Sequence, residues 1–139
     1  MKYEEYQKLL PLKYYDFKYD LMLYPDACVY VVISSRGRGK TYSALKYSYE
    51  NDIPIIYMKR TNDDVAFICR EEKDGLDTSP YYPINRDLNS VIKGKLIDTG
   101  VGGFWNYSLN EEGKLVADSL PIAYALSLNA IKRIKGFDA

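Results

Sequence analysis

The sequence has no histidine and only two cysteines in 139 residues. Histidine is the commonest general base and the commonest metal ligand near neutral pH, so its absence excludes Ser-His-Asp catalysis, Cys-His catalysis and histidine-bound metals. Cys28 and Cys69 lie far apart and form no Cys-x-x-Cys pair, which indicates neither a zinc site nor a redox motif. Cys28 opens an apolar run, and we expect it to be a small core residue.

The sequence also lacks net charge and long apolar segments. Lysine plus arginine number 19, as do aspartate plus glutamate, so the whole chain has no general attraction to nucleic acid or membrane, and any basic surface must be local. No apolar run approaches the roughly 18–20 residues that cross a bilayer. We therefore expect a soluble, cytoplasmic protein of one domain, whose scattered tyrosines pack in amphipathic elements rather than form a platform for bases.

An apolar strand, a glycine-rich loop and a helix are predicted in succession. Cys28 to Ile33 is rich in β-branched and aromatic residues without alternation, which is typical of a strand buried on both faces of a parallel sheet. Ser34 to Thr41 then reads Ser-Ser-Arg-Gly-Arg-Gly-Lys-Thr. A helical pattern follows and stops at Asn51-Asp52. Its packing face is expected to comprise Tyr42, Leu45 and Tyr49, with the small residues Ala44 and Ser48 beside them.

A second apolar strand is predicted from Ile53 to Thr61. Strand, loop, helix and strand in this order form a βαβ unit, whose crossover is right-handed in nearly all known cases. Asn62 or Asp63 is expected to cap a second helix. That helix is expected to run through Val65, Ile68 and Cys69.

The remaining chain is predicted to be a polar loop, Gly75 to Pro83, followed by short strands with glycine turns. Asn110 to Gly113 lies between two extended runs, as a hairpin loop does. We therefore expect an α/β fold, an incomplete P-loop NTPase-like domain with a parallel βαβ core and an added antiparallel hairpin region. Its parts are an N-terminal extension with a short helix, an irregular segment and a turn at Pro25-Asp26 (1–26), the P-loop βαβα unit (27–74) and a β-rich part (75–139).

The glycine-rich loop departs at one position from the Walker pattern G-x-x-x-x-G-K-[ST]. In that motif, backbone N–H groups wrap the phosphates, the lysine reaches the β and γ phosphates, and the hydroxyl binds Mg²⁺. Ser34 stands where the first glycine is expected and keeps a small side chain there. A helix N-terminus adds its own attraction for anions. We therefore expect Mg-ATP as ligand, with Thr41 on the metal. The predicted nucleotide-binding residues are Ser34, Ser35, Arg36, Gly37, Arg38, Gly39, Lys40 and Thr41.

Arginine is unusual within such a loop. A guanidinium at Arg36 beside the γ-phosphate would sense that group and stabilise transition-state charge, so Arg36 and Lys40 are the predicted catalytic groups. Arg38 either joins them or points to solvent. Lys59 and Arg60 end the second strand at the edge of the sheet where ligands of open α/β folds bind. Arg60 is either an accessory ligand contact or a solvated charge.

A hydrolysing P-loop enzyme also needs an acidic residue at the end of a further buried strand. No run of four apolar residues is followed by Asp or Glu. Asp98 is considered as a Mg²⁺ ligand, but it follows only two apolar residues and leads into a glycine turn. The apolar run from Leu120 ends in Ser127 and Asn129. We therefore expect the catalytic carboxylates to lie outside this sequence.

These motifs resemble the N-terminal part of the ATPase domain of phage terminase large subunits, and most closely the DNA-encapsidation ATPases of small tailed phages. The resemblance rests on the Ser34 to Thr41 loop with its following tyrosine and helix, and on a strand ending Tyr-Met-Lys-Arg-Thr. Terminase loops often lack the first glycine and carry an arginine at the place of Arg36. Residues 119–139 also resemble the stretch that precedes the acidic strand in these proteins, so the likeness spans about Val29 to Ala139.

The resemblance implies a DNA-packaging motor that couples ATP hydrolysis to the translocation of double-stranded DNA into a procapsid through its portal. It implies a homo-oligomeric ring in the host cytoplasm and no membrane contact. It also implies that the strand with the Mg²⁺-binding Asp and the catalytic Glu would follow the end of this sequence. The chain alone would then bind nucleotide without turnover.

A rival hypothesis needs no catalysis. Local positive charge at Arg36, Arg38, Lys59, Arg60 and the run from Ile131 to Lys135 would also suit a phosphate- or nucleic-acid-binding module. Alternation in that last run is equally typical of an edge strand with one solvated face. A fragment of another P-loop NTPase is the remaining alternative.

Overall fold

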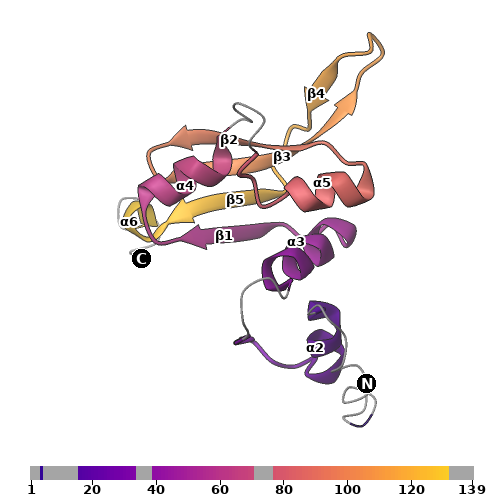
Figure 1. Cartoon of the computed structure of the whole chain (residues 1–139), viewed down its shortest axis with the longest axis vertical. Coiled ribbons are helices and arrows are strands. Elements are labelled where there is room, and N and C mark those ends of the chain that lie inside the picture. Colours follow the sequence, from indigo (N-terminus) through magenta and orange to yellow (C-terminus); the bar gives the residue numbers. More distant parts are fainter. Residues whose placement is uncertain (1–3, 5–15, 34–38, 71–76, 132–139) are drawn as a thin grey trace. The chain divides into compact units, whose positions relative to one another are not determined.

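The computed structural model describes residue 4 and residues 16–33, 39–70 and 77–131 (Figure 1). The chain divides into two compact units, Met1–Asn51 and Asp52–Ala139. Two helices with described bounds lie in the first unit, and the described sheet belongs to the second. Within these residues, the helices are too short or too polar to cross a membrane.

The first unit is organised around the ring of Phe17. Helix α2 spans Phe17–Leu23 and is capped by Asp16, whose carboxylate accepts a hydrogen bond from the Lys18 N–H at 3.1 Å. The Phe17 ring meets the rings of Tyr30 and Tyr47 edge to face, with centroids 5.5 and 5.9 Å apart. The Phe17 N–H also donates to the Ser43 hydroxyl. These contacts join α2, the segment around Tyr30 and helix α3, while Pro25-Asp26 forms the expected turn.

Helix α3, Lys40–Glu50, confirms the predicted helix. Its last turn ends at Asn51, whose N–H donates to the Tyr47 carbonyl at 3.1 Å. Leu45 and Ser48 are buried as expected, and Ser43 is buried with them. Ala44 is exposed, so its assignment to the packing face was wrong. The buried face of the helix therefore includes two serines, and the hydroxyl of Ser43 accepts the hydrogen bond from the Phe17 N–H.

The prediction of a strand from Cys28 to Ile33 is wrong. Those residues have no strand hydrogen bonding, and the side chains of Val29, Val31 and Ile33 are 77%, 80% and 91% exposed. Cys28 is exposed as well, so its assignment to the core is wrong. A β-branched run becomes a buried strand only when neighbouring strands pair with its edges, and the first unit shows no other strand among its described residues. The first strand of the expected βαβ unit is therefore not formed.

The second unit contains a mixed sheet of five strands in the order β1-β5-β3-β2, with β4 paired to β3 alone. The strands are β1 Ile55–Lys59, β2 Ile92–Asp98, β3 Val101–Leu109, β4 Leu115–Ala117 and β5 Ala123–Ser127. β1 and β5 are parallel, while β5, β3, β2 and β4 are joined by antiparallel pairs. The expected antiparallel hairpin region and the hairpin loop after β3 are confirmed. The protein is therefore α/β with a mixed sheet, and the parallel neighbour of β1 comes from far along the chain.

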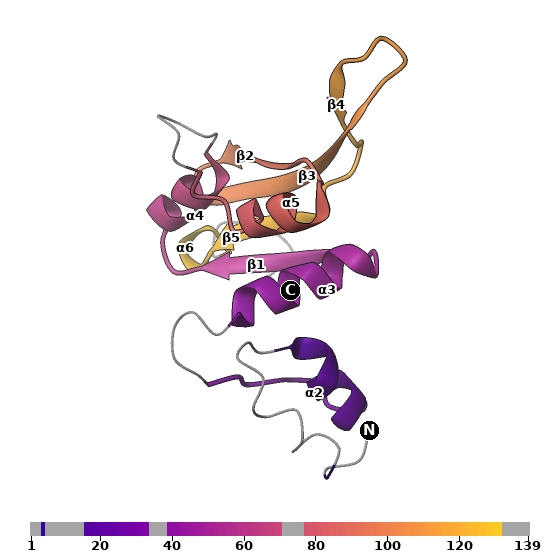
Figure 2. The same cartoon turned by 45° about the vertical axis from the view of Figure 1, so that its right-hand side comes forward.

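Helices α4 (Asn62–Cys69) and α5 (Tyr82–Leu88) lie on the same side of this sheet in both views (Figures 1 and 2). The predicted helix is confirmed as α4, and Val65, Ile68 and Cys69 form its buried face. Its cap is Thr61 rather than Asn62 or Asp63, since the Thr61 hydroxyl accepts from the Asp64 N–H at 3.2 Å. A short helix α6 (Leu128–Ile131) follows β5.

Glycines let α4 approach the sheet closely. A Cβ atom on Gly102 would lie 2.5 Å from the Cys69 sulfur, and one on Gly94 would lie 2.9 Å from the Cys69 Cα. Burial at this contact raises the pKa of Cys69 to about 11, against a smaller opposing effect of the Gly103 backbone hydrogen bond. Cys69 is therefore a packed, protonated thiol in the core.

Helix α5 was not predicted, and it begins inside the expected polar loop, so that prediction is wrong for Tyr82 and Pro83. Pro83 falls in the first turn, where its missing N–H costs nothing. Tyr81, which precedes the helix, is 1% exposed and packs on Phe104 with ring centroids 5.0 Å apart. Ile84 is fully buried beside it. Tertiary packing of Tyr81 and Ile84 explains why this proline-rich stretch is helical.

Candidate phosphate-binding site

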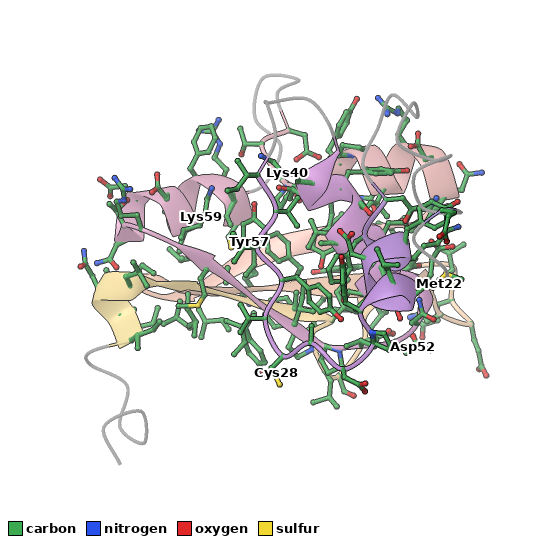
Figure 3. The ribbon with its side chains drawn as sticks, turned by 90° about the horizontal axis from the view of Figure 1, so that it is seen from below. Met22, Cys28, Lys40, Asp52, Tyr57 and Lys59 are labelled. Carbon is green, nitrogen blue, oxygen red and sulfur yellow. The ribbon has the colours of Figure 1, made fainter. Side chains whose placement is uncertain are left out.

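The described part of the predicted site is the start of helix α3. Gly39 has φ 82° and ψ 19°, which is the left-handed region, and α3 begins at the next residue, Lys40 (labelled in Figure 3). The Gly39 carbonyl accepts the first helical hydrogen bond, from the Ser43 N–H at 2.9 Å. Glycine adopts this backbone conformation without strain, whereas other residues do so at a cost. The glycine directly before the lysine is therefore required by the turn that starts the helix.

The electrostatics of this helix start favour an anion. Gly39 supplies no side-chain cap, and the first turn contains no acidic residue. The partial positive charge of the helix N-terminus therefore adds to the ammonium group of Lys40. Thr41 is exposed in the same turn. The charge and the hydroxyl needed for a phosphate and its metal are thus adjacent at one helix end.

The other predicted loop residues lie outside the described part of the structure. They are Ser34, Ser35, Arg36, Gly37 and Arg38. Their roles in wrapping phosphates, including γ-phosphate sensing by Arg36, stay predictions.

The basic residues that end β1 belong to the second unit. The ammonium group of Lys59 lies over the Tyr57 ring, 5.7 Å from its centroid, on the face of the strand where Tyr57 also lies (Figure 3). Arg60 is exposed directly after the strand. Lys59 ends β1 and Arg60 follows it, at the carboxyl end of a strand in a parallel pair. The predicted common edge with the glycine-rich loop is not formed, because the described residues that lead into that loop form no strand.

Sequence reasoning missed a buried polar cluster at this same edge. The Ser127 hydroxyl donates to the Asn62 side-chain oxygen and accepts from the Ala130 N–H at 2.9 Å. Gly100, at φ +75°, lies so close that a Cβ would be 2.6 Å from the Ser127 hydroxyl. Ser127 ends an apolar run, but nothing in the sequence pairs it with Asn62. The cluster joins the starts of α4 and α6 to the β2–β3 turn, which is a structural role.

The described carboxylates do not form a metal-binding group. Asp98 ends β2, is exposed, and accepts a hydrogen bond from the adjacent Thr99 N–H at 2.7 Å. Over residues 16–33, 39–70 and 77–131, no group of three or more Cys, Asp or Glu side chains could hold a metal ion. Among the described residues, the start of α3 with Lys40 and Thr41 is therefore the remaining candidate site. No protein-family model, no curated protein and no solved structure matches the chain.

Proposed function

We propose that the start of α3 binds the phosphates of a magnesium nucleotide, with Lys40 on the phosphates and Thr41 toward the metal. The observation that carries the proposal is the left-handed Gly39 followed at once by a helix whose first turn is basic and free of acidic residues. A phosphate-binding loop needs this glycine because backbone N–H groups must approach the phosphate oxygens closely. Serine at position 34 is compatible with the loop because its side chain is small.

The finer proposal is that the chain is the ATP-binding part of a viral DNA-packaging ATPase. It is supported by the resemblance of the Ser34 to Thr41 loop and of the strand ending in Lys59-Arg60 to phage terminase large subunits. The proposed partners of the parent motor are double-stranded DNA, the portal of a procapsid and further copies of the same subunit. Adenine is favoured over guanine by that resemblance alone.

Titration with a fluorescent ATP analogue and Mg²⁺ tests the binding site. We expect Lys40→Ala to weaken binding at least about tenfold, because a charged contact to phosphate is lost. Lys46→Ala is the matched control: it removes the same charge from the same helix, but Lys46 pairs with Glu50 at 4.0 Å toward the other end. Equal affinity of the wild type and Lys40→Ala would contradict the proposal.

The metal and the rival hypothesis are tested in the same titration. Thr41→Ala should reduce the gain in affinity that Mg²⁺ gives, while Thr41→Ser should keep it, because serine retains the hydroxyl. A second titration uses duplex DNA at two salt concentrations. Salt-sensitive DNA binding that is indifferent to Lys40, without nucleotide binding, would favour the phosphate- or nucleic-acid-binding module instead.

A further inference from the structure

The two faces of the sheet in the second unit are covered differently. The face under α4 and α5 carries Phe104, Ala123 and Ala125, all of which are buried. On the other face, the register places Ile56 beside Tyr124 and Met58 beside Leu126. Ile56, Met58 and Tyr124 are 55%, 51% and 44% exposed, although Leu126 is buried. Such a row of exposed apolar side chains on neighbouring strands marks an interaction surface.

The same open face continues across β3 and β2. Lys93 lies opposite Trp105 and Lys95 lies opposite Gly103. The ammonium group of Lys93 is 5.2 Å from the Tyr107 ring centroid, so the lysine lies along the face rather than away from it. Among the described residues, neither lysine has a carboxylate partner. We call this surface, formed by Ile56, Met58, Lys93, Lys95, Trp105 and Tyr124, the open face.

A second unpartnered surface is the hairpin of β3 and β4, which extends beyond the rest of the sheet in both views (Figures 1 and 2). We call residues 107–117 the arm. Leu109 and Leu115 pair across its two strands and are 68% and 46% exposed. Among the described strands, β4 pairs with β3 alone. A two-stranded ribbon of this kind is marginally stable in water, so its apolar pair gains from contact with another surface.

The charges of the arm and of the open face are opposite. The tip of the arm carries Glu111 and Glu112 with Lys114, so it is net negative, and all three are exposed. The part of the chain that the structure describes gives neither glutamate a basic partner. The open face instead offers Lys93 and Lys95 beside its apolar strip. An apolar surface with an acidic end thus exists on the same molecule as an apolar surface with a basic border.

The arm cannot reach the open face of its own sheet, because it continues β3 outward from that sheet (Figure 1). We propose that the chain associates head to tail, with the arm of one copy lying on the open face of the next. Leu109 and Leu115 pack against Ile56, Met58 and Tyr124, and the glutamates of the tip approach Lys93 and Lys95. Because the two surfaces differ, the contact is heterologous and repeats from copy to copy.

A second copy suits the open face better than a nucleic acid does. Stacking platforms for bases combine aromatic side chains with a basic groove, and Trp105 and Tyr124 with two lysines partly meet that description. Ile56 and Met58, however, give the β1 side of the face an aliphatic surface with no charge. Aliphatic groups are matched by the leucines of the arm, whereas bases and phosphates gain little from them.

Sedimentation velocity of the full chain over a concentration series tests the association. The arm variant Leu109→Thr/Leu115→Thr and the face variant Ile56→Thr/Met58→Thr place threonine, a β-branched residue that suits strands, at each position. Each should raise the dissociation constant at least about tenfold. Val116→Thr is the control, because Val116 is also 47% exposed on the arm but lies on its opposite face, so its association should match the wild type. Circular dichroism checks that all variants fold.

Mixing the variants separates a head-to-tail contact from a symmetric one. Each variant retains one intact surface, so arm and face variants that are monomeric alone should form a dimer, and nothing larger, when mixed. Charge reversal gives a second test: Glu111→Lys/Glu112→Lys and Lys93→Glu/Lys95→Glu should each self-associate more weakly than the wild type, and an equimolar mixture of the two should recover the association of the wild type.

Three outcomes would overturn the proposal. A wild type that stays monomeric over the whole series has no such contact, and arm and face variants that do not form the mixed dimer imply another interface. Binding of single-stranded oligonucleotide that is lost in the face variant, with association unchanged, would assign the face to nucleic acid. None of these readouts depends on nucleotide binding, so the outcome at the start of α3 is independent.

Discussion

The side-chain amide of Asn85 closes the outer edge of β2, and its removal is the most informative stability test. Its Oδ1 accepts the Ile92 N–H at 2.9 Å, and its Nδ2 donates to the Ile92 carbonyl at 2.9 Å. The Ser90 hydroxyl also donates to Oδ1 at 2.9 Å. The amide thus takes the place that a residue of a neighbouring strand would have at this edge of the sheet.

Asn85→Ala removes all three hydrogen bonds and leaves both backbone groups of Ile92 unpaired. At about 1 kcal/mol for each bond, with more where water cannot replace it, the free energy of unfolding should fall by about 2–4 kcal/mol. For a unit of this size that corresponds to a loss of roughly 10 °C or more in Tm. Ser90→Ala removes one of the three bonds and should cost only about 1 kcal/mol.

Asn85→Asp makes the stability at this edge depend on pH in a direction that can be predicted. At neutral pH one carboxylate oxygen can still accept from the Ile92 N–H and the Ser90 hydroxyl, but the other faces the Ile92 carbonyl without a proton to donate, so the variant is less stable than the wild type. Below the ordinary carboxyl pKa of about 4, the protonated acid can donate again, and the deficit relative to the wild type should shrink. Urea unfolding at several pH values measures this. A cost for Asn85→Ala no larger than that for Ser90→Ala would refute the edge-closing role.

Three further predictions concern packing. Tyr81 is buried and its hydroxyl has no hydrogen-bond partner among the described residues, so Tyr81→Phe should raise the free energy of unfolding by about 1 kcal/mol in thermal or urea unfolding. Because burial raises the pKa of Tyr81, the unfolded chain ionises first, and Tyr81→Phe should also lessen the loss of stability above about pH 10. Gly102→Ala should cost about 1–3 kcal/mol, part of which Cys69→Ala restores in a double-mutant cycle, since the clash is with the sulfur. Val31→Thr should change the free energy of unfolding by less than about 0.5 kcal/mol, because the side chain is 80% exposed. A loss above about 1.5 kcal/mol would instead support the buried strand predicted from the sequence.

The helices that the sequence predicts correctly are those whose signals are local. Helix α3 has a glycine before it, apolar residues at helical spacing and Asn51 after it, and α4 has capping residues just before its apolar positions. Helix α5 was missed because its cause is distant: Tyr81 and Ile84 are buried through contacts such as that with Phe104, which periodicity over seven residues does not show.

The strand predicted at Cys28 to Ile33 failed for a similar reason. Composition identifies residues that suit a strand but not whether another strand is present to pair with them. β1 has such a partner in β5, yet its parallel register with Ala123 could not be read from either segment alone. For the candidate site, Gly39 and Lys40 were predictable from the motif, whereas the Asn62–Ser127 hydrogen bond depends on the same distant pairing.

The parallel pairing of β1 with β5 also bears on how the chain emerges from the ribosome. Ile55 pairs with Ala123, so β1 is synthesised well before its only described neighbour in the sheet. At about 5–20 residues per second, translation leaves this strand without that neighbour for roughly 3–14 s. During that interval the sequence Ile-Pro-Ile-Ile-Tyr-Met is an apolar strand with both edges unpaired. Chaperone binding to nascent chains stalled before Ala123, and its loss once β5 has emerged, is the expected consequence of this topology.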